Sequence, residues 1–131
     1  MVFDFSYMHE QWQVKNIERI VAPLYPSWDG GCYRKYLDTF GLGGAQNGKK
    51  HIKDLSRGMQ MKLMLAIALS HDAKLLILDE PTKGLSESDA AELLELLRRI
   101  ARSRDPKRVV IIVTSDDAVA SAAQKVYDLT D

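Results

Sequence analysis

The sequence predicts an α/β fold with parallel strands at its centre and an α-helical subdomain packed against one end. Two short runs, Leu75–Leu78 and Val109–Val113, contain only branched apolar residues, which is typical of strands buried on both faces of a parallel sheet. An amphipathic helix is predicted between them, over Ser86–Ala101. Strand, helix and strand then form a right-handed βαβ unit. We expect the helical subdomain over about residues 6–71 and the rest of the α/β core over about residues 72–131.

Composition limits the class of protein. The chain of 131 residues suits one domain, and its 18 basic and 18 acidic residues balance, so there is no electrostatic case for a nucleic-acid partner. The single cysteine, Cys32, excludes an intrachain disulfide and fits a reducing compartment. No stretch approaches the roughly 20 apolar residues of a bilayer-spanning helix, and the first residues do not form a signal peptide. We expect a soluble, cytoplasmic chain, which would dock onto other subunits and not insert into the membrane if it serves a membrane transporter.

The first third of the sequence is predicted to be mainly helical. Val2–Phe5 is compatible with a short strand. Val14–Ala22 has apolar residues at helical spacing, and a second helix is expected over about Cys32–Phe40, with Asp29 as its N-terminal cap. Gly41 supplies the positive φ that a helix C-terminus favours.

The segment Gly43–Lys50 is predicted to be a flexible turn. It fits the pattern G-x-x-x-x-G-K, but a phosphate-binding loop needs Ser or Thr after the lysine, a strand before it and a helix after it. Here the next residue is Lys50 and the preceding element is helical.

The remaining elements follow from apolar periodicity. Met59–Leu69 is apolar almost all round, which predicts a helix buried on several sides. After the βαβ unit, a last helix is expected at about Ala118–Gln124, followed by a short strand at Val126–Leu129.

Two adjacent carboxylates, Asp79 and Glu80, end the first apolar strand. Pro81 cannot donate to a strand ladder, so the strand should stop there and present both acids at its carboxyl end, where open α/β sheets bind their ligands. Neighbouring carboxylates repel unless they share a cation or a proton. A magnesium site is the simplest resolution, and a solvated acidic turn is the alternative.

The flanking motifs carry a resemblance to a known family. Leu55-Ser56-Arg57-Gly58-Met59-Gln60 opens the apolar helix, and Asp79-Glu80-Pro81-Thr82 with Lys83-Gly84-Leu85-Ser86 follows the strand. In this order the motifs resemble the signature, Walker B and D-loop of ATP-binding subunits of ABC transporters, most specifically over Ala66–Thr82. The resemblance implies a partial P-loop NTPase core with parallel strands, together with the α-helical subdomain that carries the signature.

The resemblance also implies roles for individual residues. Ser56 and Gly58 would reach the γ-phosphate of ATP held by the other subunit of a dimer, although Ser56 alone reads equally as an ordinary helix cap. Asp79 would hold Mg²⁺ through its water shell. Glu80 would be the general base toward the attacking water, and its alternative is a plain strand-end carboxylate.

Several positions depart from the family pattern. Ser86 stands where the D-loop has Asp, and Ser115 replaces the switch histidine, whose longer side chain serves as a hydrogen-bonding hinge. No Walker A loop, adenine-stacking aromatic or Q-loop glutamine occurs before the signature. The sequence therefore resembles the C-terminal half of such an ATPase. Met1 would mark an expressed fragment, an internal start or a truncated gene.

The resulting expectation is an ATP-binding and ATP-hydrolysing subunit that lacks its phosphate-binding loop. The parent protein would use ATP and Mg²⁺, neither of which this chain alone should hold tightly. Its partners would be a transmembrane transporter subunit and a homo- or heterodimeric ATPase partner at the inner face of the membrane. The alternative, favoured by Ser86 and Ser115, is a non-catalytic α/β scaffold or a degenerate or engineered domain derived from such an ATPase.

Overall fold

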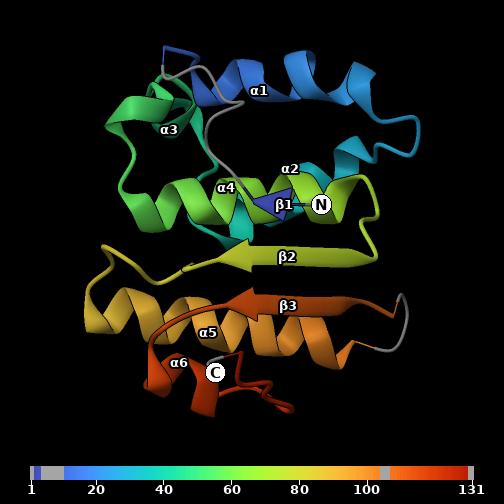
Figure 1. Ribbon diagram of the computed structural model, residues 1–131. Helices are drawn as coiled ribbons and strands as arrows, with labels where there is room; N and C mark the ends of the chain where they lie inside the picture. Colours follow the sequence, from blue (N-terminus) through green and yellow to red (C-terminus); the bar gives the residue numbers. More distant parts are fainter. Residues whose placement is uncertain (1, 4–10, 104–106, 130–131) are drawn as a thin grey trace. The chain divides into compact units, whose positions relative to one another are not determined.

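The computed structural model describes residues 2–3, 11–103 and 107–129 (Figure 1). The chain divides into two compact units, Met1–Ala73 and Lys74–Asp131, each with its own set of packed elements. In the described residues, no helix combines the length and the apolarity needed to cross a bilayer.

The first unit is mainly helical. Its elements are β1 (Val2–Phe3), α1 (Val14–Val21), a 3₁₀ turn (Ala22–Leu24), α2 (Gly30–Thr39), α3 (Ala45–Gly48), a second 3₁₀ turn (Ile52–Asp54) and α4 (Arg57–Ser70). The predicted helices are therefore present, with ends shifted by one or two residues. Of the predicted strand Val2–Phe5, the first two residues form β1, and the other two lie outside the described residues.

Helix α4 forms the core of this unit. Met61 and every residue from Leu63 to Ser70 are buried, as its apolar composition predicts, and α2 packs against it. The one buried polar side chain of this helix, Ser70, donates its hydroxyl to the Ala66 carbonyl at 2.6 Å. Such a bond within the helix satisfies the hydroxyl without a partner from elsewhere.

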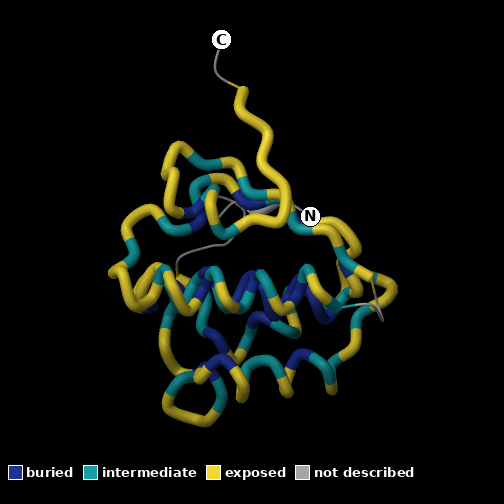
Figure 2. Tube along the Cα trace, turned by 90° about the horizontal axis from the view of Figure 1, so that it is seen from below, coloured by how far each residue is buried: buried dark blue, intermediate teal, exposed yellow. Residues whose placement is uncertain are grey.

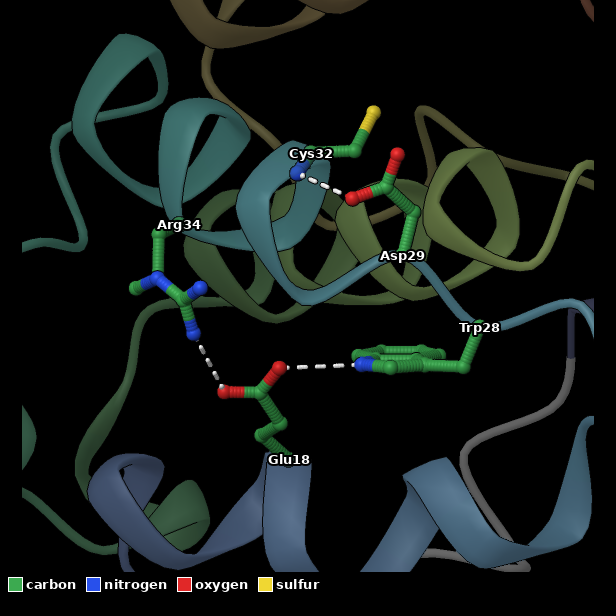
Figure 3. A network of polar contacts seen from close by, with 5 residues as sticks. All are labelled: Glu18, Trp28, Asp29, Cys32 and Arg34. Atoms are coloured by element: carbon green, nitrogen blue, oxygen red, sulfur yellow. Dashed lines mark hydrogen bonds and ion pairs between the residues drawn. The ribbon is translucent and has the colours of Figure 1, made fainter.

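The connector between α1 and α2 is held by a polar network (Figure 3). The Glu18 carboxylate accepts the Trp28 indole N–H at 2.9 Å and an Arg34 guanidinium N–H at 3.3 Å. Asp29 caps α2, as expected, by accepting the Cys32 amide at 3.0 Å. Burial, together with the nearby Glu18 charge, raises the pKa of Tyr33 above its usual value.

The segment after α2 corrects one expectation. Gly41 has the predicted positive φ, at 77°. Gly43–Lys50, however, is not a plain turn, because Ala45–Gly48 makes one helical turn, α3. Asn47 closes this turn by donating its side-chain amide to the Gly43 carbonyl at 2.8 Å. Side chain to backbone bonds of this kind stabilise short turns that composition alone does not reveal.

The second unit contains β2 (Leu75–Asp79), α5 (Glu87–Arg102), β3 (Val109–Val113) and α6 (Asp117–Ser121). The strands pair in parallel, with Leu75 opposite Val109 and Asp79 opposite Val113, so the predicted βαβ order is present. The predicted last helix, Ala118–Gln124, is shorter than expected. No strand forms at Val126–Leu129, which is an exposed segment near the C-terminus (Figure 2).

Burial of the two strands differs from the prediction. Leu76 and Leu78 are fully buried, but Leu75, Val109, Ile111 and Val113 are 42–49% exposed. The register places the exposed residues on one face of the β2–β3 ladder. Leu76 and Leu78, on the opposite face, are the buried ones. The expectation that both strands are buried on both faces is therefore wrong.

Candidate functional site

The candidate site lies at the carboxyl end of β2. Asp79 is the last residue of the strand, and the Glu80 amide donates to the Val113 carbonyl at 2.7 Å, which extends the pairing with β3 by one bond. Glu80 then takes a positive φ of 46°, which is uncommon for a residue with a side chain. The chain turns sharply there, and the buried Pro81 anchors the turn.

The Glu80 carboxylate accepts hydrogen bonds from Thr114 and Ser115, in the segment after β3. Its Oε1 accepts the Ser115 amide at 2.7 Å, and its Oε2 accepts the Thr114 hydroxyl at 3.1 Å. The Ser115 backbone bond is the main cause that lowers the pKa of Glu80 below its usual value, and the Ser115 hydroxyl, Thr114 and the Lys83 charge add to it. Hydrogen bonds to the charged form favour that form, so Glu80 is a carboxylate at neutral pH.

Thr114 is a site residue that the sequence analysis missed. It follows β3 directly, as Glu80 follows β2, and the register pairs Asp79 with Val113. The residues after two paired strand ends therefore meet. A parallel pairing of the two predicted strands in this register is the signal that would have identified Thr114.

Ser115 contacts Glu80 even though it replaces the expected switch histidine. The contact is made by the backbone amide, which any residue except proline provides. The loss of the longer side chain therefore does not remove this hydrogen bond to the acid.

Asp79 is the one residue that the sequence predicts as a metal ligand. Its side chain is exposed at the strand end, and the described residues contain no group of three or more His, Cys, Asp or Glu side chains arranged to hold a metal. Mg²⁺ in enzymes is commonly bound by one or two carboxylates, with waters and substrate phosphates completing the shell. An exposed carboxylate at a strand end is compatible with such a shell, and the role of Asp79 stays a prediction.

Two of the predicted site residues act as helix caps. The Ser56 hydroxyl accepts the Met59 amide at 3.2 Å at the start of α4, and the Ser86 hydroxyl accepts the Asp89 amide at 3.1 Å at the start of α5. Serine and aspartate are comparably good N-caps, which gives a physical account of Ser86 at a position where Asp is expected. Gly58 lies in the first turn of α4.

The predicted site residues fall in different units. Asp79, Glu80, Ser86 and Ser115 belong to the second unit, where the structure brings Glu80 and Ser115 together. Ser56 and Gly58 belong to the first unit.

Comparison with known sequences finds one family. The sequence model of the ABC transporter family matches residues 3–83. Among curated proteins, the chain is 35% identical over 95 residues to a pyoverdine export ATP-binding/permease protein of Pseudomonas savastanoi, which covers 72% of this chain and 14% of that protein. It is 29% identical over 133 residues to a macrolide export ATP-binding/permease protein of Chlorobaculum tepidum, covering 98% and 20%. The chain thus spans at most a fifth of these two relatives.

Comparison with solved structures supports the same fold. The chain superposes with a TM-score of 0.70 on a metal-chelate type ABC transporter in an inward-facing conformation, at 23% identity, covering 92% of this chain and 50% of that one. It superposes with a TM-score of 0.68 on a dimeric ATP-binding cassette bound to ADP and Pi, at 21% identity, covering 93% and 54%. The predicted fold class, a partial P-loop NTPase core with a helical subdomain, is confirmed.

Proposed function

The chain belongs to the ABC transporter family of ATP-binding domains, and from this premise we propose that it supplies the signature, metal-binding and catalytic carboxylate elements of an ATPase. The complete ATPase would also need a phosphate-binding loop, because no segment of the 131 residues matches G-x-x-x-x-G-K-[ST]. We use the term assembled ATPase for this chain together with the polypeptide that provides that loop.

The geometry around Glu80 is the observation that carries the proposal. An ionised carboxylate stands at the carboxyl end of a parallel strand, next to Asp79, with both of its oxygens engaged by donors. Phosphoryl transfer requires mainly positioning and charge neutralisation from the protein. A fixed carboxylate beside a metal-binding carboxylate provides both.

The lowered pKa of Glu80 favours a role in orienting the attacking water over a role as general base. A general base works best when its pKa lies near the operating pH, whereas this carboxylate is held below its usual value. We therefore assign Glu80 to orienting the attacking water through a hydrogen bond. Asp79 would carry Mg²⁺ through bound water, and the ion would neutralise charge on the phosphates.

The remaining assignments concern partners. Ser56 and Gly58, at the start of α4, would contact the γ-phosphate of ATP bound to the second subunit of a dimer, since amides at a helix N-terminus favour anions. The two relatives described above are export ATP-binding/permease proteins. By analogy, the assembled ATPase would dock onto a transmembrane transporter subunit at the cytoplasmic face of the membrane.

The test of this function is a single substitution in the assembled ATPase. The phosphate-binding loop is supplied by the corresponding segment of the Chlorobaculum tepidum relative, fused before Met1. We expect Mg²⁺-dependent ATP turnover that Glu80→Gln lowers by about 100-fold or more, while ATP binding survives. Equal turnover with glutamine at this position would exclude the role.

A second candidate is a non-catalytic domain that retains the fold. It is favoured by Ser86 and by Ser115, whose side chain is shorter than the expected histidine. The same experiment separates the two candidates. A non-catalytic domain gives an assembly that folds and dimerises but shows no Mg²⁺-dependent turnover even with Glu80 intact.

A further inference from the structure

Thr114 is the one side chain outside the predicted site residues that donates to the Glu80 carboxylate in the described part of the chain. Its hydroxyl lies 3.1 Å from Oε2, while the Ser115 amide lies 2.7 Å from Oε1. One donor on each oxygen fixes the rotation of the carboxylate about its terminal bond. The Ser115 hydroxyl also hydrogen-bonds to this carboxylate. Donors on both oxygens are needed to fix the orientation, because this torsion has broad minima.

The direction of the Thr114 hydroxyl is itself determined by a neighbour. Its Oγ1 accepts the Asp116 amide at 3.0 Å. A hydroxyl carries one proton, so with Oγ1 acting as acceptor toward Asp116, the proton remains for Glu80. Asp116 is held in turn, because its carboxylate caps α6 by accepting the Ala118 amide at 2.9 Å. The orientation therefore passes from the start of α6 through Thr114 to Glu80.

The backbone keeps these groups at a constant separation. The Glu80 amide bonds to the Val113 carbonyl at 2.7 Å, and Asp79 and Val113 are partners in the parallel ladder. Glu80 and Thr114 thus extend from two strand ends that are hydrogen-bonded to each other. Sites built on regular elements hold their side chains more accurately than sites on free loops.

We propose that Thr114 is a positioning residue, whose hydroxyl acts with the Ser115 amide to hold the Glu80 carboxylate in the orientation that engages the attacking water. This inference rests on the proposed function of Glu80. Thr114 touches neither ATP nor metal in this assignment, so its loss affects the chemical step and leaves nucleotide affinity unchanged.

The experiment compares three variants in the assembled ATPase. Thr114→Val removes the hydroxyl at nearly constant volume, and Thr114→Ser retains it. The control, Thr39→Val, makes the same change at an exposed position of α2. There the hydroxyl donates to the Lys35 carbonyl of the same helix. We expect Thr114→Val to lower kcat at least about tenfold, as loss of a hydrogen bond to a charged group predicts, with KM for ATP within about twofold of the original. Thr114→Ser should restore most of kcat, and Thr39→Val should change neither constant.

Each outcome decides the matter. Unchanged kcat in Thr114→Val, or a rise in KM without a fall in kcat, overturns the positioning role. If Glu80→Gln lowers turnover while Thr114→Val does not, the positioning inference fails and the proposed function stands. If Glu80→Gln itself has no effect, the proposed function fails. Circular dichroism of each variant checks folding, and Thr114→Ala replaces Thr114→Val if the valine variant does not fold.

Discussion

Ile111 on β3 lies opposite Ile77 on β2 in the parallel ladder, and its side chain is 45% exposed although it is one of five consecutive apolar residues. In the described residues β3 pairs with β2 alone, so its second edge is open. An apolar strand with an open edge and no charged residue is a template for pairing with another chain.

We therefore predict that the isolated chain self-associates at micromolar concentration. Ile111→Lys should give a monomer, because a charge at an exposed strand position opposes pairing. Val126→Lys, at an exposed position outside the strands, is the matched control and should still associate. Sedimentation velocity over a range of concentrations measures this. A concentration-independent monomer of the original sequence would contradict the prediction.

The second prediction concerns nucleotide affinity. The segment with the G-x-x-x-x-G-K pattern forms the one-turn helix α3 after α2, without the strand that precedes a phosphate-binding loop. We expect the isolated chain to bind Mg-ATP no more tightly than about 1 mM, or about 4 kcal/mol, and Lys49→Ala to leave this unchanged. Isothermal titration calorimetry measures both. A micromolar constant lost in Lys49→Ala would make this segment a nucleotide site.

The third prediction uses two neighbouring leucines on β2. Leu76 is fully buried, whereas Leu75 is 42% exposed. Leu76→Ala should lower the free energy of unfolding by about 2–5 kcal/mol, because it leaves a cavity. Leu75→Ala should cost less than about 1 kcal/mol, since it removes a half-exposed side chain. Urea unfolding followed by circular dichroism measures both, and similar losses would mean that the exposed face is covered in solution.

The fourth prediction concerns pH. Because the pKa of Glu80 is lowered in the folded state, its hydrogen bonds stabilise the fold above the usual pKa of a glutamate, and this contribution is lost as the pH falls through the lowered value. The stability difference between the original chain and Glu80→Gln should therefore be largest near neutral pH and shrink below about pH 4. Urea unfolding at several pH values measures it. A difference that does not vary with pH would contradict the prediction.

The sequence predicted the helices and strands better than it predicted which of their faces are buried and which strands pair. The runs Leu75–Leu78 and Val109–Val113 predicted two parallel strands correctly, and the all-apolar helix predicted the buried α4. Their composition could not reveal the open face, because an apolar run looks the same whether one or both of its faces are covered. Val126–Leu129 has strand-like composition but no strand partner, and a strand needs partners as well as propensity.

Part of the candidate site was missed for a similar reason, because a linear motif does not show which residues meet in space. The motif predicted Asp79 and Glu80 as site residues from adjacent positions, and their roles stay predictions. Thr114 is 34 positions away from Glu80, and only the register of the parallel pair brings the two together. Ser115 was interpreted by the loss of the longer histidine side chain. Its strongest contact with Glu80 uses the backbone amide, which the identity of the residue does not reveal.

Both tryptophans of the chain, Trp12 and Trp28, lie in the first unit, and the bond from the Trp28 indole to Glu18 ties the second of them to α1. Intrinsic fluorescence excited at the indole band therefore reports on the first unit alone, while far-ultraviolet circular dichroism reports on both. Transitions that coincide for the two signals would show one cooperative unfolding event. An earlier or later fluorescence transition would show that the helical unit melts independently of the strands that carry Glu80.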